Sequence, residues 1–243
     1  MQQIAGKGDI MLNNGAIGIE YSFLFEDGNR KNFEISLDSS MHVAARKAPP
    51  PAWTALGQHQ CPSCTLSPAE AHPYCPIAVQ LAQVVEAFAD FSSYDNVTVT
   101  VTTEQRIYSK KTTLQQGVSS LTGLLMATSG CPVMDYLKPM ARFHLPFASV
   151  EETEFRMLSM FLVAQLKRQA KGLTPDWTLE GLKAIYAKVS EINAHFAKRL
   201  REVAKNDANI NALVNLDCFA KAVPWAVRTR LNDLDALFEA YLK

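Results

Sequence analysis

The chain has 243 residues, of which 48% are hydrophobic and 20% charged, a composition typical of a globular protein with a sizeable core. Basic and acidic residues both total 24, so the formal net charge is zero. Nucleic-acid binding relies on an excess of basic residues that neutralise phosphates, so this balance argues against that function. No run approaches the roughly 18 apolar residues that cross a bilayer, and the first residues lack the apolar core of a secretory signal. We therefore expect a soluble, cytoplasmic protein without a membrane span.

The beginning of the chain predicts a β-hairpin. Residues 1–15 are small, polar and rich in glycine and asparagine, and we expect them to be mobile. Apolar residues then alternate over residues 17–25 and again over residues 33–37, which is typical of half-buried strands. Between the two runs lies Asp27-Gly28, and such a pair favours a tight turn because glycine accepts positive φ.

A proline triplet ending at Pro51 predicts an extended connector, which leads into a cluster of cysteines. Apolar residues at helical spacing then predict a helix over residues 77–91, with Pro76 in its first turn. Within residues 96–103 valine alternates with threonine, which predicts a half-buried strand, and residues 105–109 are expected to form a short partner strand.

The second half of the sequence predicts helices almost throughout. Prolines break the segment from Cys131 to Phe147, which allows short helical turns at most. The pair Ser149 and Glu152 has the spacing of a capping box. The predicted helices cover residues 113–128, 150–170, 178–204, 207–221 and 225–242, with Pro175 and Pro224 at two of the joints.

These elements predict an α+β fold. An N-terminal antiparallel sheet, made of the hairpin plus one or two further strands, packs on a C-terminal helical bundle. We expect an α+β part over residues 16–112, which contains a metal-binding knuckle at residues 61–75. A mainly helical part follows over residues 113–243, and the two parts are expected to form one continuous unit.

Four residues of the knuckle, Cys61, Cys64, His72 and Cys75, have the spacing of a metal site. A Cys-x2-Cys pair directs two thiolates at one centre, and a second pair about ten residues later completes a tetrahedron. Prolines beside the ligands reduce the entropy lost when the ligands are ordered. We therefore predict a closed Cys3His site that holds a structural zinc ion.

Other interpretations of the same cysteines remain open. The thiols are free if His72 is only a surface residue, and His59 competes with it as the nitrogen ligand. An iron–sulfur cluster is the alternative cofactor, because cysteine precedes proline at Cys61, Cys75 and Cys131, and Cys131 would then supply the fourth ligand. A haem-based redox sensor built on the same dipeptides is a further alternative.

The segment that follows Ser129 contains the candidate catalytic residues. Cys131 precedes a proline, and a thiol at the start of a helical turn has a lowered pKa. Lys138, Arg142 and His144 are close to it in sequence and would form an anion pocket or activate the thiolate. The structural interpretation is that Cys131 is a buried small apolar residue and that Arg142 pairs with a nearby glutamate.

Two blocks of the sequence stand out: CPSC…HPYCPIAV, and SSLTGLLMATSGCPVMDYLKPMARFHLPF with the following EETEFRMLSMFLVAQ. Together with the Asp-Gly hairpin and the late NDANINALVNLD, they resemble an uncharacterised bacterial protein family, a domain of unknown function. The resemblance extends from about Ile17 to Leu242. It implies that hairpin, cysteine cluster and helical half belong to one unit, and it implies no activity.

The sequence lacks a glycine-rich phosphate loop, a G-x-S-x-G motif and an H-E-x-x-H motif. We therefore expect a metal-binding protein that acts as a binding, regulatory or scaffold module, with a protein partner or a second copy of itself. The alternative function is an enzyme, which would use Cys131 with His144 or a metal with an open position. The sequence does not indicate a small-molecule ligand.

Overall fold

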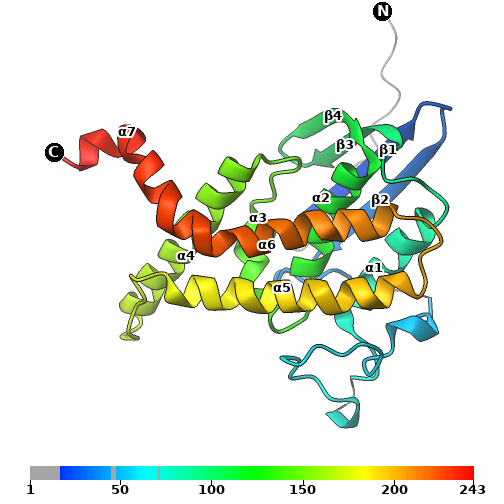
Figure 1. Cartoon of the computed structure of the whole chain (residues 1–243), viewed down its shortest axis with the longest axis horizontal. Helices are drawn as coiled ribbons and strands as arrows, with labels where there is room; N and C mark the ends of the chain where they lie inside the picture. Colours follow the sequence, from blue (N-terminus) through cyan, green and yellow to red (C-terminus); the bar gives the residue numbers. More distant parts are fainter. Residues whose placement is uncertain (1–16, 45–47, 71) are drawn as a thin grey trace, which may run out of the picture.

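The computed structural model describes residues 17–44, 48–70 and 72–243. Its N-terminal part is a four-stranded antiparallel sheet in the order β2-β1-β3-β4, shown in Figure 1. Gly28 at the hairpin turn has a φ of 85°, the conformation that the Asp-Gly pair predicts. The strands are β1 (Ile17–Phe25), β2 (Arg30–Leu37), β3 (Asn96–Thr103) and β4 (Ile107–Thr113).

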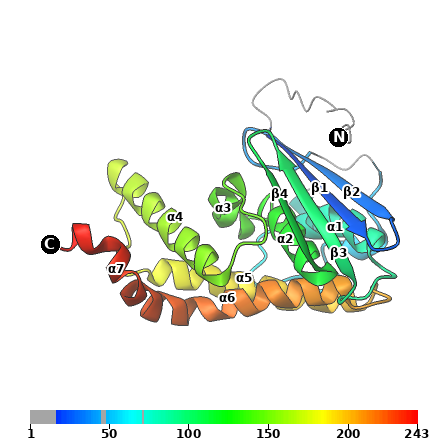
Figure 2. The same cartoon turned by 90° about the horizontal axis from the view of Figure 1, so that it is seen from above.

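One face of the sheet forms the main core. Tyr21 pairs with Phe33 on one side and with Val101 on the other, so that apolar residues of three strands share this face. Helices α1 (Pro76–Ala87) and α2 (Leu114–Ala127) cover it, as Figure 2 shows. Directly after α1, Phe88 is fully buried, with its ring centroid 5.0 Å from that of Phe23.

The C-terminal part is helical, and α5 (Glu180–Arg201) lies side by side with most of α6 (Ala208–Asp233), as Figure 1 shows. Helix α6 also packs on α2, where Gly123 of α2 leaves room for the Leu216 side chain of α6. The elements are a 3-10 turn (Met134–Leu137), α3 (Lys138–Arg142), α4 (Val150–Ala170), α5 (Glu180–Arg201), α6 (Ala208–Asp233), α7 (Asp235–Phe238) and a last 3-10 turn (Glu239–Tyr241).

The structure confirms the predicted α+β class, the N-terminal antiparallel sheet and the absence of long helices between residues 131 and 147. The capping box is also present, with Ser149 and Glu152 each bonding to the backbone of the other. The mobile segment predicted at residues 1–15 lies outside the described residues, and the division at residue 112 stays a prediction. No helix within the described ranges is long and apolar enough to cross a bilayer.

The predicted helix break at Pro224 is wrong, because α6 continues through this residue. Proline removes one N–H from the helical hydrogen bonds. On both sides of it, however, Ala220, Val223 and Ala226 are at least 98% buried against the rest of the protein. The burial of this apolar stripe offsets the lost hydrogen bond, so the helix does not end at the proline.

Candidate metal centre

Four cysteines from three separate segments line one small cavity. They are Cys61 and Cys64 of the knuckle, Cys75 before α1, and Cys131 after α2. The cavity has a volume of about 30 Å³, and Arg199 of α5 contributes to its wall. The structure therefore brings together three of the predicted ligands with a fourth cysteine that lies 56 residues beyond Cys75 in the sequence.

The first two thiols are carried by a turn that is fixed to helix α5. The N–H of Cys64 donates to the carbonyl oxygen of Cys61 at 2.9 Å. Between them, the backbone N–H and the hydroxyl of Ser63 both donate to the carboxylate of Glu191 on α5, at 2.9 and 2.5 Å. These two bonds hold the pKa of Glu191 below its usual range, so the carboxylate stays ionised and keeps the turn in place.

Cys75 stands at the N-cap of α1, and its own N–H donates to the carbonyl oxygen of Thr54 at 2.8 Å. Pro76 follows and has no N–H, and the backbone N–H groups of the next two residues, Ile77 and Ala78, favour the ionised form of the Cys75 sulfur. Burial raises the pKa of this thiol, and the two N–H groups and the charge of Arg199 lower it. The helix start thus offsets part of the effect of burial on this thiol.

Cys131 reaches the cavity through a tight turn after α2. Ser129 donates its hydroxyl hydrogen to the carbonyl oxygen of Met126 at 2.8 Å and accepts the N–H of Cys131 at 3.2 Å. Gly130 adopts a φ of 86°, which reverses the chain. As at Cys75, a proline follows, and the N–H groups of Val133 and Met134 favour the ionised form of the sulfur, although burial raises the pKa of this thiol.

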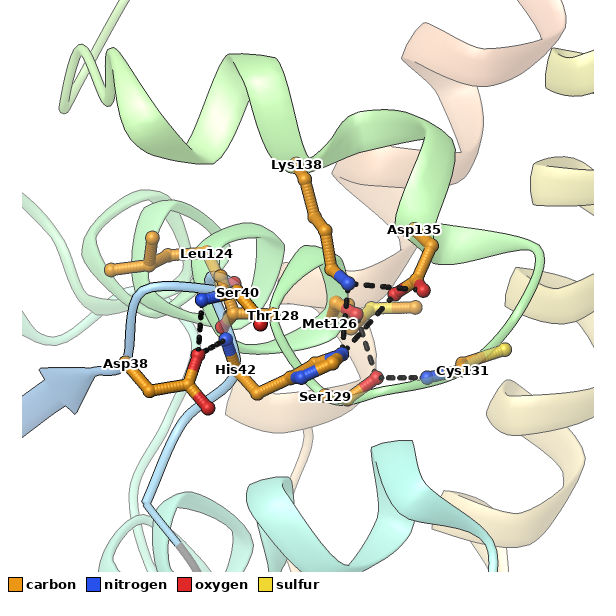
Figure 3. Close-up of polar contacts among 10 residues, drawn as sticks. All are labelled: Asp38, Ser40, His42, Leu124, Met126, Thr128, Ser129, Cys131, Asp135 and Lys138. Atoms are coloured by element: carbon orange, nitrogen blue, oxygen red, sulfur yellow. Dashed lines mark hydrogen bonds and ion pairs between the residues drawn. The ribbon is translucent and has the colours of Figure 1, made fainter.

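A separate group of polar residues supports this turn from the other side. Lys138 lies 2.8 Å from the ring of His42 and 3.0 Å from the carboxylate of Asp135. Asp38 in turn accepts the N–H of His42 at 2.9 Å. Figure 3 shows the sulfur of Cys131 turned away from these residues. Lys138 therefore stabilises the loop around the turn, at a place where it does not meet the thiol.

Arg199 is the charged residue of the cavity, and only 2% of its surface is exposed. Its guanidinium donates to the carbonyl oxygens of Trp53 and Ala55, both at 2.8 Å. Ala55 forms an isolated β-bridge with Tyr74, next to Cys75. Through these contacts Arg199 fastens the segment that carries the knuckle and places a buried positive charge beside the thiols.

Burial and the neighbouring thiols raise the pKa of Cys61 to about 12, and burial also raises the pKa of Cys131. The thiols of Cys61 and Cys131 are therefore neutral at pH 7 without an ion, and an ion that binds them must displace their protons. Among the described residues, no group of three or more histidine, cysteine, aspartate or glutamate side chains has an arrangement that could hold a metal ion. The predicted Cys3His site is accordingly not shown, and ligation requires the sulfurs to move together.

The predicted nitrogen ligands lie apart from the four cysteines. His72 is exposed and does not line the cavity. The ring of His59 contacts the carboxylate of Glu202 at 2.5 Å, which fixes the knuckle to α5 at a second place. Cys218, the fifth cysteine, is exposed on α6. The sequence signal for the fourth thiol is the cysteine–proline dipeptide, which occurs at Cys61, Cys75 and Cys131.

The candidate catalytic residues are spread over different surroundings. His144 contacts the hydroxyl of Tyr21 at 2.5 Å and lines another pocket than Cys131 does. Burial and the nearby charge of Arg156 lower the pKa of His144 to about 4, so its ring is neutral. Arg142 is exposed and lies over the ring of Phe143. Within the described part of the chain, no hydrogen bond or ion pair joins Cys131 to His144, Arg142 or Lys138.

Comparisons with known proteins identify the family to which the chain belongs. No curated protein and no solved structure matches the chain. A family model does match residues 19–239, a range that includes all four cysteines of the cavity. The chain therefore belongs to the family described as "Domain of unknown function (DUF6901)".

Proposed function

We propose that this protein binds one metal ion through Cys61, Cys64, Cys75 and Cys131, and that the ion is a structural zinc. The observation that carries the proposal is that four thiols from three segments line one small cavity beside a buried guanidinium. The set replaces His72 of the predicted site with Cys131. Zinc binds four thiolates in a tetrahedron with zinc–sulfur distances of about 2.3 Å. Its d-electrons impose no further geometry that the cysteine-bearing loops would have to match.

The charges around the cavity support a metal–thiolate centre. A divalent ion with four thiolates has a net charge of −2, which is costly to bury without compensation. Arg199 supplies a positive charge, its hydrogen bonds in the described residues go to carbonyl oxygens, and the charge of Glu202 acts on it without a hydrogen bond between them. The N–H groups that follow Pro76 and Pro132 supply further compensation at two of the sulfurs. These surroundings stabilise the ionised form of the sulfurs.

An iron–sulfur cluster is the second candidate, and the all-cysteine set favours it, because such clusters are held by thiolates. The size of the cavity argues for the single ion. A volume of about 30 Å³ corresponds to about two water-sized spheres. A four-iron cluster would have to displace the walls, among them the buried Leu56, Ile77 and Ile192.

The role that we propose for the ion is to hold a surface for a partner. The segment that carries Cys131 continues into Tyr136 and Phe143, of which 65% and 66% are exposed. A centre that fixes this segment keeps both aromatic side chains in place for another protein or for a second copy of the chain. The protein would then act as a binding or scaffold module.

The test is the metal content of freshly purified, untagged protein, measured by elemental analysis together with an absorption spectrum. We expect one zinc ion per chain and no visible absorbance. Cys131→Ser is expected to lose the metal, whereas His72→Ala is expected to retain it. Cys218→Ser is the matched control, since it removes an exposed thiol that is remote in sequence from the cavity segments.

Three outcomes would contradict the proposal in different ways. Metal that is lost in His72→Ala and kept in Cys131→Ser would support the Cys3His set instead. Iron with visible absorption bands would support the cluster. A wild-type protein that contains no metal and binds none after reduction and addition of zinc would remove the metal centre altogether.

A further inference from the structure

A second cavity, separate from the cysteines, lies where the sheet meets the helical part. Its volume is about 520 Å³, within the range of small-molecule sites. Its walls come from β4, α2, α3 and the starts or middles of α4, α5 and α6. Figure 2 shows α3 between α2 and α4, above the pair α5–α6. The apolar part of the wall includes Met126, Met134, Met140, Leu216 and Phe219.

One wall residue is a buried amide that lacks a partner. Asn193 of α5 is 2% exposed, and within the described residues neither its amide nitrogen nor its amide oxygen has a hydrogen bond. Leaving both groups unpaired in the interior is unfavourable, and leucine of similar size would avoid the cost. An amide that faces a cavity under such conditions suits a ligand that both accepts and donates a hydrogen bond.

The other polar end of the cavity is cationic. Arg156 of α4 uses one terminal nitrogen, Nη2, to donate to the carbonyl oxygens of Met140 and Phe143, at 2.9 and 2.7 Å. Its remaining N–H groups have no hydrogen bond within the described part of the chain. Among the described residues of the wall there is no aspartate or glutamate, although the charge of Glu152 acts on Arg156 from outside the wall. The cavity therefore favours a ligand with a carboxylate.

The spacing of the two ends sets the length of the ligand. Arg156 donates to the carbonyl oxygen of Met140, and the hydroxyl of Tyr186 donates to the sulfur of the same Met140 at 3.5 Å, so the guanidinium lies near Tyr186 of α5. Asn193 follows Tyr186 by seven residues on the same helix, and both line the cavity. Seven residues of α-helix span about 10 Å. An extended chain of about ten carbon atoms covers this separation.

We propose that this cavity binds an amphipathic carboxylate of medium length with a second polar group at its far end. The carboxylate pairs with Arg156, the apolar chain lies on the methionines and Phe219, and the far polar group bonds to the amide of Asn193. The site is independent of the cysteine cavity, since the two share no wall residue.

The test is calorimetric titration of the full chain with ω-hydroxydecanoate. Two comparison probes each lack one end: decanoate lacks the far hydroxyl, and the terminal decanediol lacks the carboxylate. We expect each to bind the wild type about tenfold more weakly than ω-hydroxydecanoate, since each loses one polar interaction. In Asn193→Leu the difference between ω-hydroxydecanoate and decanoate should vanish, and in Arg156→Gln the difference between ω-hydroxydecanoate and the diol should vanish.

Two controls keep the result interpretable. Arg168→Gln removes an arginine that donates to Thr174 outside this cavity, and it should leave all three affinities unchanged. If Arg156→Gln fails to fold, Arg156→Lys takes its place as the second variant, because it keeps the positive charge. No binding of ω-hydroxydecanoate at about 1 mM, or binding that is equal in the wild type and in Asn193→Leu and Arg156→Gln, would overturn the proposal. Neither outcome depends on the metal content.

Discussion

Replacing Arg199 with methionine tests how strongly helix α5 holds the cysteine-bearing loop. The guanidinium donates to Trp53 and Ala55 at 2.8 Å, and methionine leaves both carbonyl oxygens without these donors. Each buried unpaired carbonyl costs about 1–3 kcal/mol. These carbonyls are only partly buried, and the substitution also removes the unfavourable burial of a charge. We therefore expect a net loss of about 2–4 kcal/mol in the free energy of unfolding.

The assay is urea denaturation followed by circular dichroism, with the free energy obtained by linear extrapolation. Arg199→Lys is the matched control. It keeps the charge but replaces the forked donor with a single ammonium, so its loss should be smaller. A loss below about 1 kcal/mol in Arg199→Met would refute the assignment of these hydrogen bonds as the main attachment of the loop.

The same variants report on the charge of the centre. If the four sulfurs bind zinc as thiolates, Arg199 compensates an anion, and the loss in Arg199→Met should be larger with zinc than with a chelator present. Equal losses under both conditions would show that the guanidinium acts only on the backbone.

Three further substitutions test the sheet, the buried histidine and a helix end. Gly117→Ala places a Cβ 2.7 Å from a methyl carbon of Val99, so we expect a net loss of about 1 kcal/mol although alanine favours helix. His144 stays neutral in the folded protein, so stability should fall by about 1–3 kcal/mol as pH falls from 6.5 to 4, and His144→Gln should remove this part of the fall. Ser149→Ala breaks the capping box with Glu152 and should cost about 1 kcal/mol. Thermal and urea unfolding measure all three.

Other outcomes of these three substitutions would contradict the predictions. A more stable Gly117→Ala would mean that the sheet and α2 pack less closely than these distances indicate. A pH dependence that is identical in the wild type and in His144→Gln would place the titration on other groups. For Ser149, Ser149→Asp is the control, because aspartate also caps helices and should retain most of the stability.

The elements that the sequence predicts well are those with local signals. The alternation around Asp27-Gly28 and the capping box at Ser149 depend on residues within a few positions of each other, and the structure has both. Pro224 has a local signal too, but the prediction failed because the buried contacts of α6 outweigh the proline. Local propensity is overridden when tertiary burial is strong.

The cysteine cavity shows the same limit at the candidate site. Spacing alone favours His72 as the fourth ligand because it lies between the knuckle cysteines and Cys75. The structure instead places Cys131 at the cavity, because α2 crosses the sheet and ends beside α1. The hydrophobic periodicity of the sequence does not indicate that Cys131 and the knuckle cysteines, which are far apart in the chain, come together. The repeated cysteine–proline dipeptide is the local signal, and its effect at Cys75 and Cys131, where backbone N–H groups after the proline favour the ionised sulfur, is visible only in the structure.

The attachment of the knuckle to α5 has a consequence for the order of folding. Ser63 is bound by Glu191 and Ala55 by Arg199, contacts that are separated by 128 and 144 residues in sequence. A ribosome adds about 5–20 residues per second, so about 6–30 s pass between the synthesis of the first cysteines and that of α5. During this interval the thiols cannot be enclosed, and they are open to metal ions and to oxidants. We expect the cysteine loop to be among the last parts of the molecule to become ordered.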